Sequence, residues 1–228
     1  MIENKIIFER FYKVFKISKD ELPLIYLKAR YISSRSLLFN QGQKANKLFF
    51  ILDGKLILGR NIGFKREEIS HVFLEPSIVG LDVLDNSARF KFYARALTPL
   101  LVIEVDGSLF NLRHLKNFKL QELIRNQLHR RLLELEEKYV RLYGGRTAFE
   151  RIKLFLIHVF SNHSERKGLS MVFKVSLTHL ELSQYLHTSR QSVTTMFNSL
   201  RNDGIISYTR SEFELHNLDT LLSWKDSR

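Results

Sequence analysis

The spacing of apolar residues changes along the chain, from a strand-like pattern in the first half to a helical one in the second. Between residues 31 and 110, short apolar stretches such as Leu48 to Leu52 and Leu100 to Val105 alternate with turn residues. Many short strands with regularly spaced turns are typical of a β-sandwich, roll or barrel. Asp53-Gly54, between two apolar runs, is the strongest hairpin signal of the region. The pattern predicts an all-β domain within residues 1–108, with a helical segment at its N-terminus.

From residue 109 to 143 the apolar period is that of a helix. One stripe has the 4, 3, 4, 3 spacing of a heptad seam and comprises Leu128, Leu132, Leu135, Tyr139 and Leu142. A second stripe is placed to pack against the β-domain and comprises Leu120, Ile124, Leu133 and Val140. Two stripes favour a dimerisation helix shared between two subunits. A helix buried within one chain stays the alternative, because the seam spans only about two heptads.

Residues 144–228 carry the pattern of a winged helix-turn-helix. Gly144-Gly145 is either a hinge or an ordinary helix end. Thr178-x-x-Glu181 is a capping box that starts a short helix, and Ser189 is placed to cap a second one. The inward face of the second helix has apolar residues at i, i+3, i+4 and i+7, namely Val193, Met196, Phe197 and Leu200. After Asp203-Gly204, two alternating segments predict a β-hairpin wing.

Polar side chains at the two helix starts and on the outward face of the second helix suit phosphates and base edges. They are Thr178, Ser189, Arg190, Gln191, Ser192, Thr194, Thr195 and Asn198. The alternative for the same stretch is a structural helical hairpin with a solvated polar face. Net charge favours the DNA interpretation, because 36 Lys+Arg against 24 Asp+Glu give a formal charge of +12 that attracts a polyanion. An acidic membrane surface is the less favoured partner, since no long apolar run or signal-peptide pattern is present.

The composition argues against several classes of protein. The chain has no cysteine, which excludes disulfides, cysteine nucleophiles and cysteine-ligated metal or iron–sulfur sites. A metal-dependent jelly-roll enzyme needs several histidines in the roll, and residues 31–110 contain only His71. A haem sensor that uses His114 or His129 is a further alternative, although a lone histidine on a charged helix is usually solvated. No catalytic motif is present, so we expect a protein that is not an enzyme and has no resident cofactor.

The order of these parts, together with two motifs, resembles the cyclic-AMP-receptor/fumarate-nitrate-regulator (Crp/Fnr) superfamily of bacterial transcription factors. The first motif is Phe39-x-x-Gly42 followed by residues 48–56. The second is Leu186-x-x-Ser189-Arg190-x-Ser192-Val193 with Leu200-x-x-x-Gly204-Ile205-Ile206. The resemblance implies an α+β fold with an N-terminal β-roll, a long dimerisation helix and a C-terminal winged helix-turn-helix. It also implies a homodimer that binds a palindromic operator in double-stranded DNA and recruits or blocks RNA polymerase.

Within the superfamily, the chain looks most like the global nitrogen regulator of cyanobacteria and its plastid-encoded counterparts in red algae. The residues that carry this resemblance are Val79-Gly80-Leu81, residues 91–99 and residues 131–136. It implies control of nitrogen-metabolism genes, in a plastid stroma or a prokaryotic cytoplasm, with 2-oxoglutarate as a small-molecule effector. The implied effector residues are Gly80, Leu81, Lys91, Arg131 and Glu136, the last as a partner that orients an arginine. Lys91 stands where the family has an arginine. Lysine keeps the positive charge but cannot form the two parallel hydrogen bonds that a guanidinium group makes to a carboxylate.

Other members of the superfamily imply two alternatives for the sensor. Members that bind cyclic AMP carry a carboxylate for the ribose and an arginine for the phosphate. In this chain Asp82 and Arg89 each lie one residue away from the corresponding position. Because neighbouring strand residues face opposite sides of the sheet, this shift disfavours a cyclic nucleotide. A ligand-independent regulator, whose roll is only a scaffold, is the other alternative. On the DNA side, the resemblance implies that Arg190 pairs with a guanine, while Gln191 and Thr195 replace residues of other members and imply a different operator.

Overall fold

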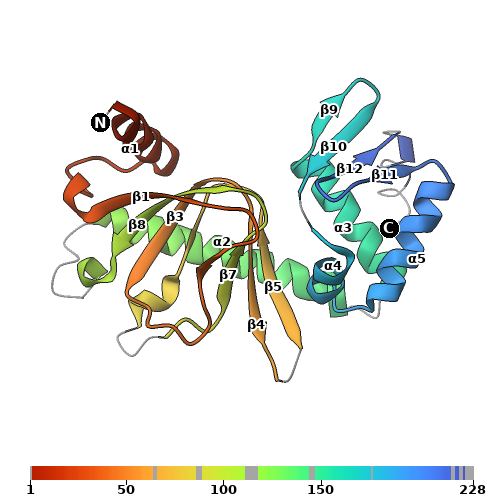
Figure 1. Ribbon diagram of the computed structural model, residues 1–228, viewed down its shortest axis with the longest axis horizontal. Helices are drawn as coiled ribbons and strands as arrows, with labels where there is room; N and C mark the ends of the chain where they lie inside the picture. The colour runs from red at the N-terminus through yellow and green to blue at the C-terminus, as the bar shows by residue number, and fades with distance from the viewer. Residues whose placement is uncertain are drawn as a thin grey trace. The chain divides into compact units, whose positions relative to one another are not determined.

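The computed structural model describes residues 2–63, 66–85, 89–110, 118–143, 147–175, 177–216, 219–220 and 223 (Figure 1). The chain forms two compact units, residues 1–134 and residues 135–228, which are described in turn. Three features of the sequence analysis fall outside the described residues: the glycine pair 144–145, His114 and the side chain of Leu142.

The first unit is a roll of two four-stranded antiparallel sheets (Figure 1). One sheet has the order β1 (Leu27–Ile32), β8 (Leu100–Asp106), β3 (Lys47–Asp53) and β6 (Ser77–Val79). The other has the order β2 (Leu37–Phe39), β7 (Tyr93–Ala96), β4 (Leu56–Asn61) and β5 (Glu67–Phe73). The helical elements of this unit are α1 (Ile2–Phe15), η1 (Leu24–Tyr26), η2 (Leu81–Leu84), η3 (Gly107–Phe110) and the start of α2 (Phe118–Tyr143).

Side chains of the roll alternate between two cores. On β8, Leu100 and Val102 point into the core between the sheets, while Leu101 and Ile103 belong to an outer core with α1 and α2. This alternation is the period of two that a strand covered on both faces requires. The inner core contains a stack of Phe39 on Phe90, with ring centroids 4.0 Å apart. The interior of the roll near this stack is therefore packed by aromatic side chains.

The turn at Asp53-Gly54 differs from the hairpin that its sequence predicts. β3 and β4 flank the turn but lie in different sheets, so the chain crosses from one sheet to the other there. Gly54 has φ 91°, and a Cβ at this position would lie 2.2 Å from the carbonyl oxygen of Pro99. Glycine is needed for this close approach of two backbone segments.

Helix α2 buries only the first part of its predicted packing stripe. Leu120 and Ile124 are buried in the outer core of the roll, whereas Leu133 and Val140 are exposed, contrary to the expectation for that stripe. The described seam residues Leu128, Leu132, Leu135 and Tyr139 are between 40% and 65% exposed in the single chain. In the described part of the chain, no helix is long and apolar enough to span a membrane.

The second unit is a helical core with a four-stranded sheet (Figure 1). Its helices after α2 are α3 (Ala148–Asn162), α4 (His179–Tyr185) and α5 (Arg190–Asn202). The sheet has the order β11 (Ile206–Tyr208), β12 (Glu212–Leu215), β10 (Ser170–Lys174) and β9 (Glu165–Lys167). The wing β11–β12 forms as the sequence predicts, and the hairpin β9–β10 is an element that the sequence analysis did not predict.

Candidate nucleic-acid interface

The two helices of the helix-turn-helix are fixed by local caps and by α3. Thr178 caps α4 in a capping box with Glu181, and the Ser189 hydroxyl accepts a hydrogen bond of 2.9 Å from the backbone N–H of Ser192. Between the helices, His187 has φ 49°, a left-handed conformation that non-glycine residues rarely adopt. The guanidinium group of Arg151 on α3 donates to the carbonyl oxygens of Leu186 (3.2 Å) and His187 (2.7 Å). Arg151 therefore holds the turn that sets the angle between α4 and α5.

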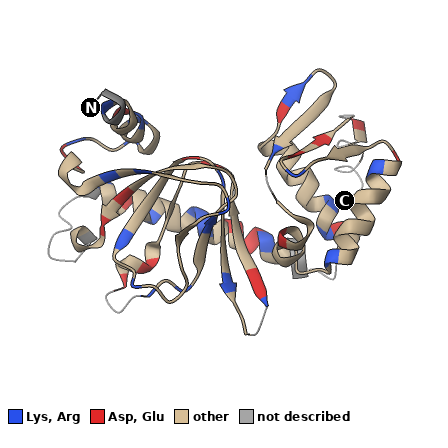
Figure 2. Ribbon diagram, viewed as in Figure 1, with Lys and Arg blue, Asp and Glu red and all other residues tan. Residues whose placement is uncertain are grey.

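Helix α5 has the two faces that its sequence predicts. Its inward residues Val193, Met196, Phe197 and Leu200 are all buried. Arg190, Gln191 and Thr195 are exposed on the other side, and no described residue forms a hydrogen bond or ion pair with their side chains. The helix contains no acidic residue (Figure 2). An exposed helix N-terminus with free N–H groups and a cation in its first turn suits a DNA phosphate or a base edge.

Three of the predicted contact residues have hydroxyl groups that serve the helix caps. The Thr178 hydroxyl donates to Glu181 Oε2 at 2.9 Å and accepts from the backbone N–H of Glu181 at 3.1 Å. The Ser189 and Ser192 hydroxyls lie 2.8 Å apart. These hydroxyl groups stabilise the first turn of each helix. A hydroxyl that also contacts DNA must do so while it keeps its hydrogen bond in the cap.

Thr194 is half-buried and contacts α4. Its hydroxyl donates to the carbonyl oxygen of Arg190 and lies 3.0 Å from Nδ1 of His179, the first residue of α4. The ring of His179 packs against Phe197 and Tyr208, with ring centroids 5.2 Å from each. Burial, and secondarily the charge of Arg190, lowers the pKa of His179, so this imidazole is neutral at physiological pH.

Asn198 is tied to the wing. The hydroxyl of Tyr208 on β11 donates to Asn198 Oδ1 at 3.0 Å, and the guanidinium group of Arg201 lies 5.6 Å from the centroid of the Tyr208 ring. This hydrogen bond orients the amide group of Asn198, which leaves its NH₂ as the group available to DNA. His179 and Tyr208 were missed by the sequence analysis because they act across elements, where no periodicity of a single helix reveals them.

The predicted effector residues are only partly brought together. Gly80 has φ 83° and leads directly into η2, which begins with Leu81. Arg131 on α2 lies near the same turn: its guanidinium is 5.8 Å from the Phe73 ring, burial lowers its pKa, and the charges of Asp82 and Glu134 oppose that shift. Lys91 is exposed. Glu136 is exposed as well, and the carboxylates that act on Arg131 are those of Asp82 and Glu134.

The metal-dependent enzyme and the haem sensor were alternatives in the sequence analysis. Among the described residues, no group of three or more His, Asp or Glu side chains is placed to hold a metal ion. His129, one of the two histidines considered for haem, is exposed on α2, and His71 is buried in β5 beside Phe73.

Comparisons with known proteins agree with this architecture. Residues 150–224 match the family described as the Crp-like helix-turn-helix domain. The transcriptional activator protein anr of Pseudomonas aeruginosa is 26% identical over 89% of this chain and 81% of its own length. The global nitrogen regulator of Nostoc sp. is 25% identical over 81% of this chain and 83% of its own.

Solved structures share the fold over most of the chain. The c-di-GMP responsive global regulator CLP of Xanthomonas campestris aligns with a TM-score of 0.71 at 19% identity, covering 92% of this chain and 98% of its own. A CRP-family transcriptional regulator of Thermus thermophilus aligns with a TM-score of 0.70 at 17% identity, covering 86% and 96%. These matches confirm the α+β fold class. The Crp-like helix-turn-helix match and the relatives that align over most of the chain support a DNA-binding transcription regulator of the Crp/Fnr type.

Proposed function

We propose that this protein is a homodimeric, ligand-responsive regulator that binds a palindromic operator and controls genes of nitrogen metabolism by recruiting or blocking RNA polymerase. The observation that carries the proposal is the outward face of α5, where Arg190, Gln191 and Thr195 are exposed and form no hydrogen bond or ion pair with any described residue. A bidentate arginine–guanine pair is worth about 1–3 kcal/mol of discrimination between bases.

The dimer is supported by the exposed seam of α2. Leu128, Leu132, Leu135 and Tyr139 repeat with heptad spacing and stay largely exposed in the single chain. A second copy of the helix would bury this stripe. Two recognition helices related by a two-fold axis then read half-sites one DNA turn apart, about 34 Å.

The effector site proposed for 2-oxoglutarate lies at the junction of the roll with α2. Arg131 supplies a partly desolvated cation there, and the backbone at Gly80 and Leu81 supplies N–H groups for a carboxylate. Packing of Phe39 on Phe90 inside the roll favours a small ligand at this junction over a cyclic nucleotide between the sheets. The role in nitrogen metabolism rests on the similarity to the Nostoc regulator, and the bacterial relatives support a prokaryotic cytoplasm or a plastid stroma.

A ligand-independent regulator is the second candidate. Asp82 and Glu134 already act on the charge of Arg131, so an anionic ligand is not needed to compensate that cation. In that case the roll serves only to present α2 for dimerisation.

Operator selection from a random-sequence duplex library tests the proposal. The selected sites are expected to form an inverted repeat. Arg190→Ala is expected to lose the preference at one base pair of each half-site, whereas the control Arg166→Ala, on the hairpin β9–β10, is expected to keep it.

Sedimentation of Leu132→Glu is expected to show monomers. Adding 2-oxoglutarate to wild-type protein and to Arg131→Gln in an anisotropy assay separates the candidates: stronger operator binding by wild type alone supports the effector, and indifference of both proteins supports the ligand-independent regulator. Selection that yields no preferred sequence contradicts operator recognition itself.

A further inference from the structure

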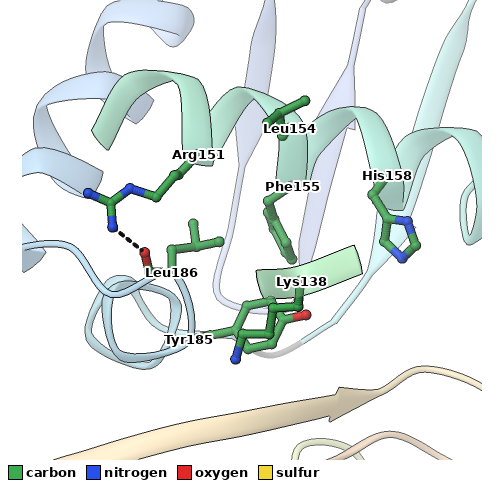
Figure 3. A pocket seen from close by; sticks show the side chains of 7 residues that line it. All are labelled: Lys138, Arg151, Leu154, Phe155, His158, Tyr185 and Leu186. Carbon is green, nitrogen blue, oxygen red and sulfur yellow. Dashed lines mark hydrogen bonds between the residues drawn. The ribbon is translucent and has the colours of Figure 1, made fainter. Parts of the chain in front are cut away.

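His179 is fixed at the junction of α4, α5 and the wing. It is the first residue of α4, and its Nδ1 lies 3.0 Å from the hydroxyl oxygen of Thr194 on α5. Its half-buried ring packs against one aromatic ring of α5 and one of β11, with both centroids 5.2 Å away. The angle between the two helices is held by Arg151, which donates to the carbonyl oxygen of Leu186 in the turn (Figure 3). Nδ1 is thus engaged within the domain, and Nε2 is the ring nitrogen left for a further partner.

The hydrogen bonds of Thr194 determine which nitrogen of His179 carries the proton. The Thr194 hydroxyl donates to the carbonyl oxygen of Arg190 at 3.0 Å, so its one hydrogen is used there. Toward His179 the hydroxyl oxygen therefore accepts, which places a hydrogen on Nδ1. In the neutral ring Nε2 then has a lone pair and no hydrogen. No described residue forms a hydrogen bond with Nε2.

The charged groups that face His179 come from α4, α5 and the wing. On α5, the charge of Arg190 acts on the imidazole, and the guanidinium group of Arg201 lies 5.6 Å from the ring of Tyr208. Tyr208 is the wing residue that packs on His179. On α4, the carboxylate of Glu181 is used in the capping box. Burial and then the charge of Arg190 lower the pKa of His179, so the ring is neutral in the free protein at physiological pH. An anion beside the ring would favour the protonated form instead.

From the unpartnered Nε2 of a ring tied to the first turn of α5, we infer that His179 donates a hydrogen bond to a DNA phosphate and takes up one proton as it does so. A phosphate oxygen only accepts hydrogen bonds, and the neutral ring has its one hydrogen on Nδ1. A proton from solvent on Nε2 supplies the missing donor, while Nδ1 keeps its bond to Thr194. The product is an imidazolium next to a phosphate, a charge-assisted pair. The inference rests on the proposed DNA-binding function and adds a proton to that reaction.

Anisotropy of a fluorescent scrambled duplex, titrated with full-length protein between pH 6 and pH 8 at constant ionic strength, tests the inference. Scrambled DNA is suitable because a phosphate contact does not depend on sequence. Wild-type affinity is expected to rise about 5- to 10-fold from pH 8 to pH 6, within the limit of about tenfold per pH unit that uptake of one proton sets. His179→Gln, with a neutral side chain that also hydrogen-bonds, is expected to stay constant within about twofold. The control His216→Gln, at the end of β12, is expected to respond as wild type does.

Three results of this experiment overturn the inference. They are a wild-type affinity that does not depend on pH, the same pH dependence in His179→Gln, and a pH dependence confined to the selected operator. The last result would assign the contact to a base edge in place of a phosphate.

A measurement on the unmodified protein gives the same answer without a variant. The NMR signal of the His179 Cε1–H is expected to titrate with a higher pKa in the complex with scrambled DNA than in the free protein. An equal or lower pKa in the complex overturns the inference. Operator selection at a single pH tests the proposed function by itself. A preferred inverted repeat that is bound independently of pH contradicts this inference alone, whereas absence of binding to any duplex contradicts both.

Discussion

The hydrogen bond between the wing and the recognition helix offers a sharp test of how this domain reads DNA. Tyr208 on β11 donates to Asn198 Oδ1 at 3.0 Å, and both side chains are half-buried. Tyr208→Phe removes the hydroxyl and keeps the ring, which packs against His179 and Phe197. The substitution therefore frees the amide of Asn198 without opening a cavity beneath α5.

The loss of operator affinity in Tyr208→Phe can be estimated from the hydrogen bond that is removed and from the cost of ordering the freed Asn198 side chain. A neutral hydrogen bond of this kind stabilises the fold by roughly 0.5–1.5 kcal/mol. Ordering a freed side chain at an interface costs about 0.5–1.5 kcal/mol as well. Binding to the selected operator is thus expected to weaken about 2- to 10-fold in Tyr208→Phe. Binding to scrambled DNA is expected to stay the same, because phosphate contacts do not depend on the orientation of one amide.

Fluorescence anisotropy with operator and scrambled duplexes at one salt concentration measures both quantities. A double-mutant cycle gives the control: once Asn198→Ala is in place, Tyr208→Phe should produce no further loss of operator affinity. The reasoning is refuted if operator and scrambled affinities fall together, or if Tyr208→Phe weakens operator binding equally with and without Asn198.

Three further predictions concern stability. Burial alone raises the pKa of Glu104, but hydrogen bonds from Lys47 and Arg30 outweigh it and hold that pKa below its ordinary value. The stabilisation is therefore complete above the unfolded pKa of about 4.3 and is lost as pH falls through the lower folded value. Glu104→Gln should lower the free energy of unfolding at neutral pH by about 1–3 kcal/mol and reduce its loss in acid, which urea titrations at several pH values measure. Gly80→Ala should cost about 1–3 kcal/mol, seen as a lower Tm, because φ is 83° and the new Cβ would lie 3.0 Å from the carbonyl oxygen of Lys47; an unchanged Tm would contradict the strain argument. Because the pKa of His179 is lowered in the fold, protonation favours the unfolded chain, and stability should fall as pH drops below about 6.5. Melting curves of wild type and His179→Gln should differ in that pH range, and parallel pH profiles would exclude His179 as the source.

Local rules were sufficient for much of the helix-turn-helix. The caps at Thr178 and Ser189 and the buried face from Val193 to Leu200 depend on neighbours within one or two turns, so the sequence pattern reveals them. The wing follows from alternation over a few residues. The hairpin β9–β10 escaped the analysis because its apolar run is short and its first strand, Glu165–Lys167, is fully polar.

The same local rules do not predict contacts between separate helices and strands. Asp53-Gly54 has the sequence of a hairpin turn, yet the partners of β3 are β8 and β6. The residues that pair with β3 lie between 26 and 59 positions away along the chain, so no local signal contains this pairing. The partner of Asn198 lies on the wing and that of Thr194 on α4, and neither contact follows from the pattern of one helix.

Positive charge is unevenly distributed between the two units of the chain. Residues 1–134 contain 23 Lys+Arg against 14 Asp+Glu, whereas residues 135–228, which include the helix-turn-helix, contain 13 against 10 (Figure 2). Most of the +12 therefore belongs to the unit that does not carry the recognition helix. Within the second unit, two acidic residues are used in helix caps, Glu150 and Glu181, while α5 has two arginines and no acid. Attraction of the recognition face to DNA thus depends on where the few acidic groups are placed, and net charge predicted the right partner without locating its surface.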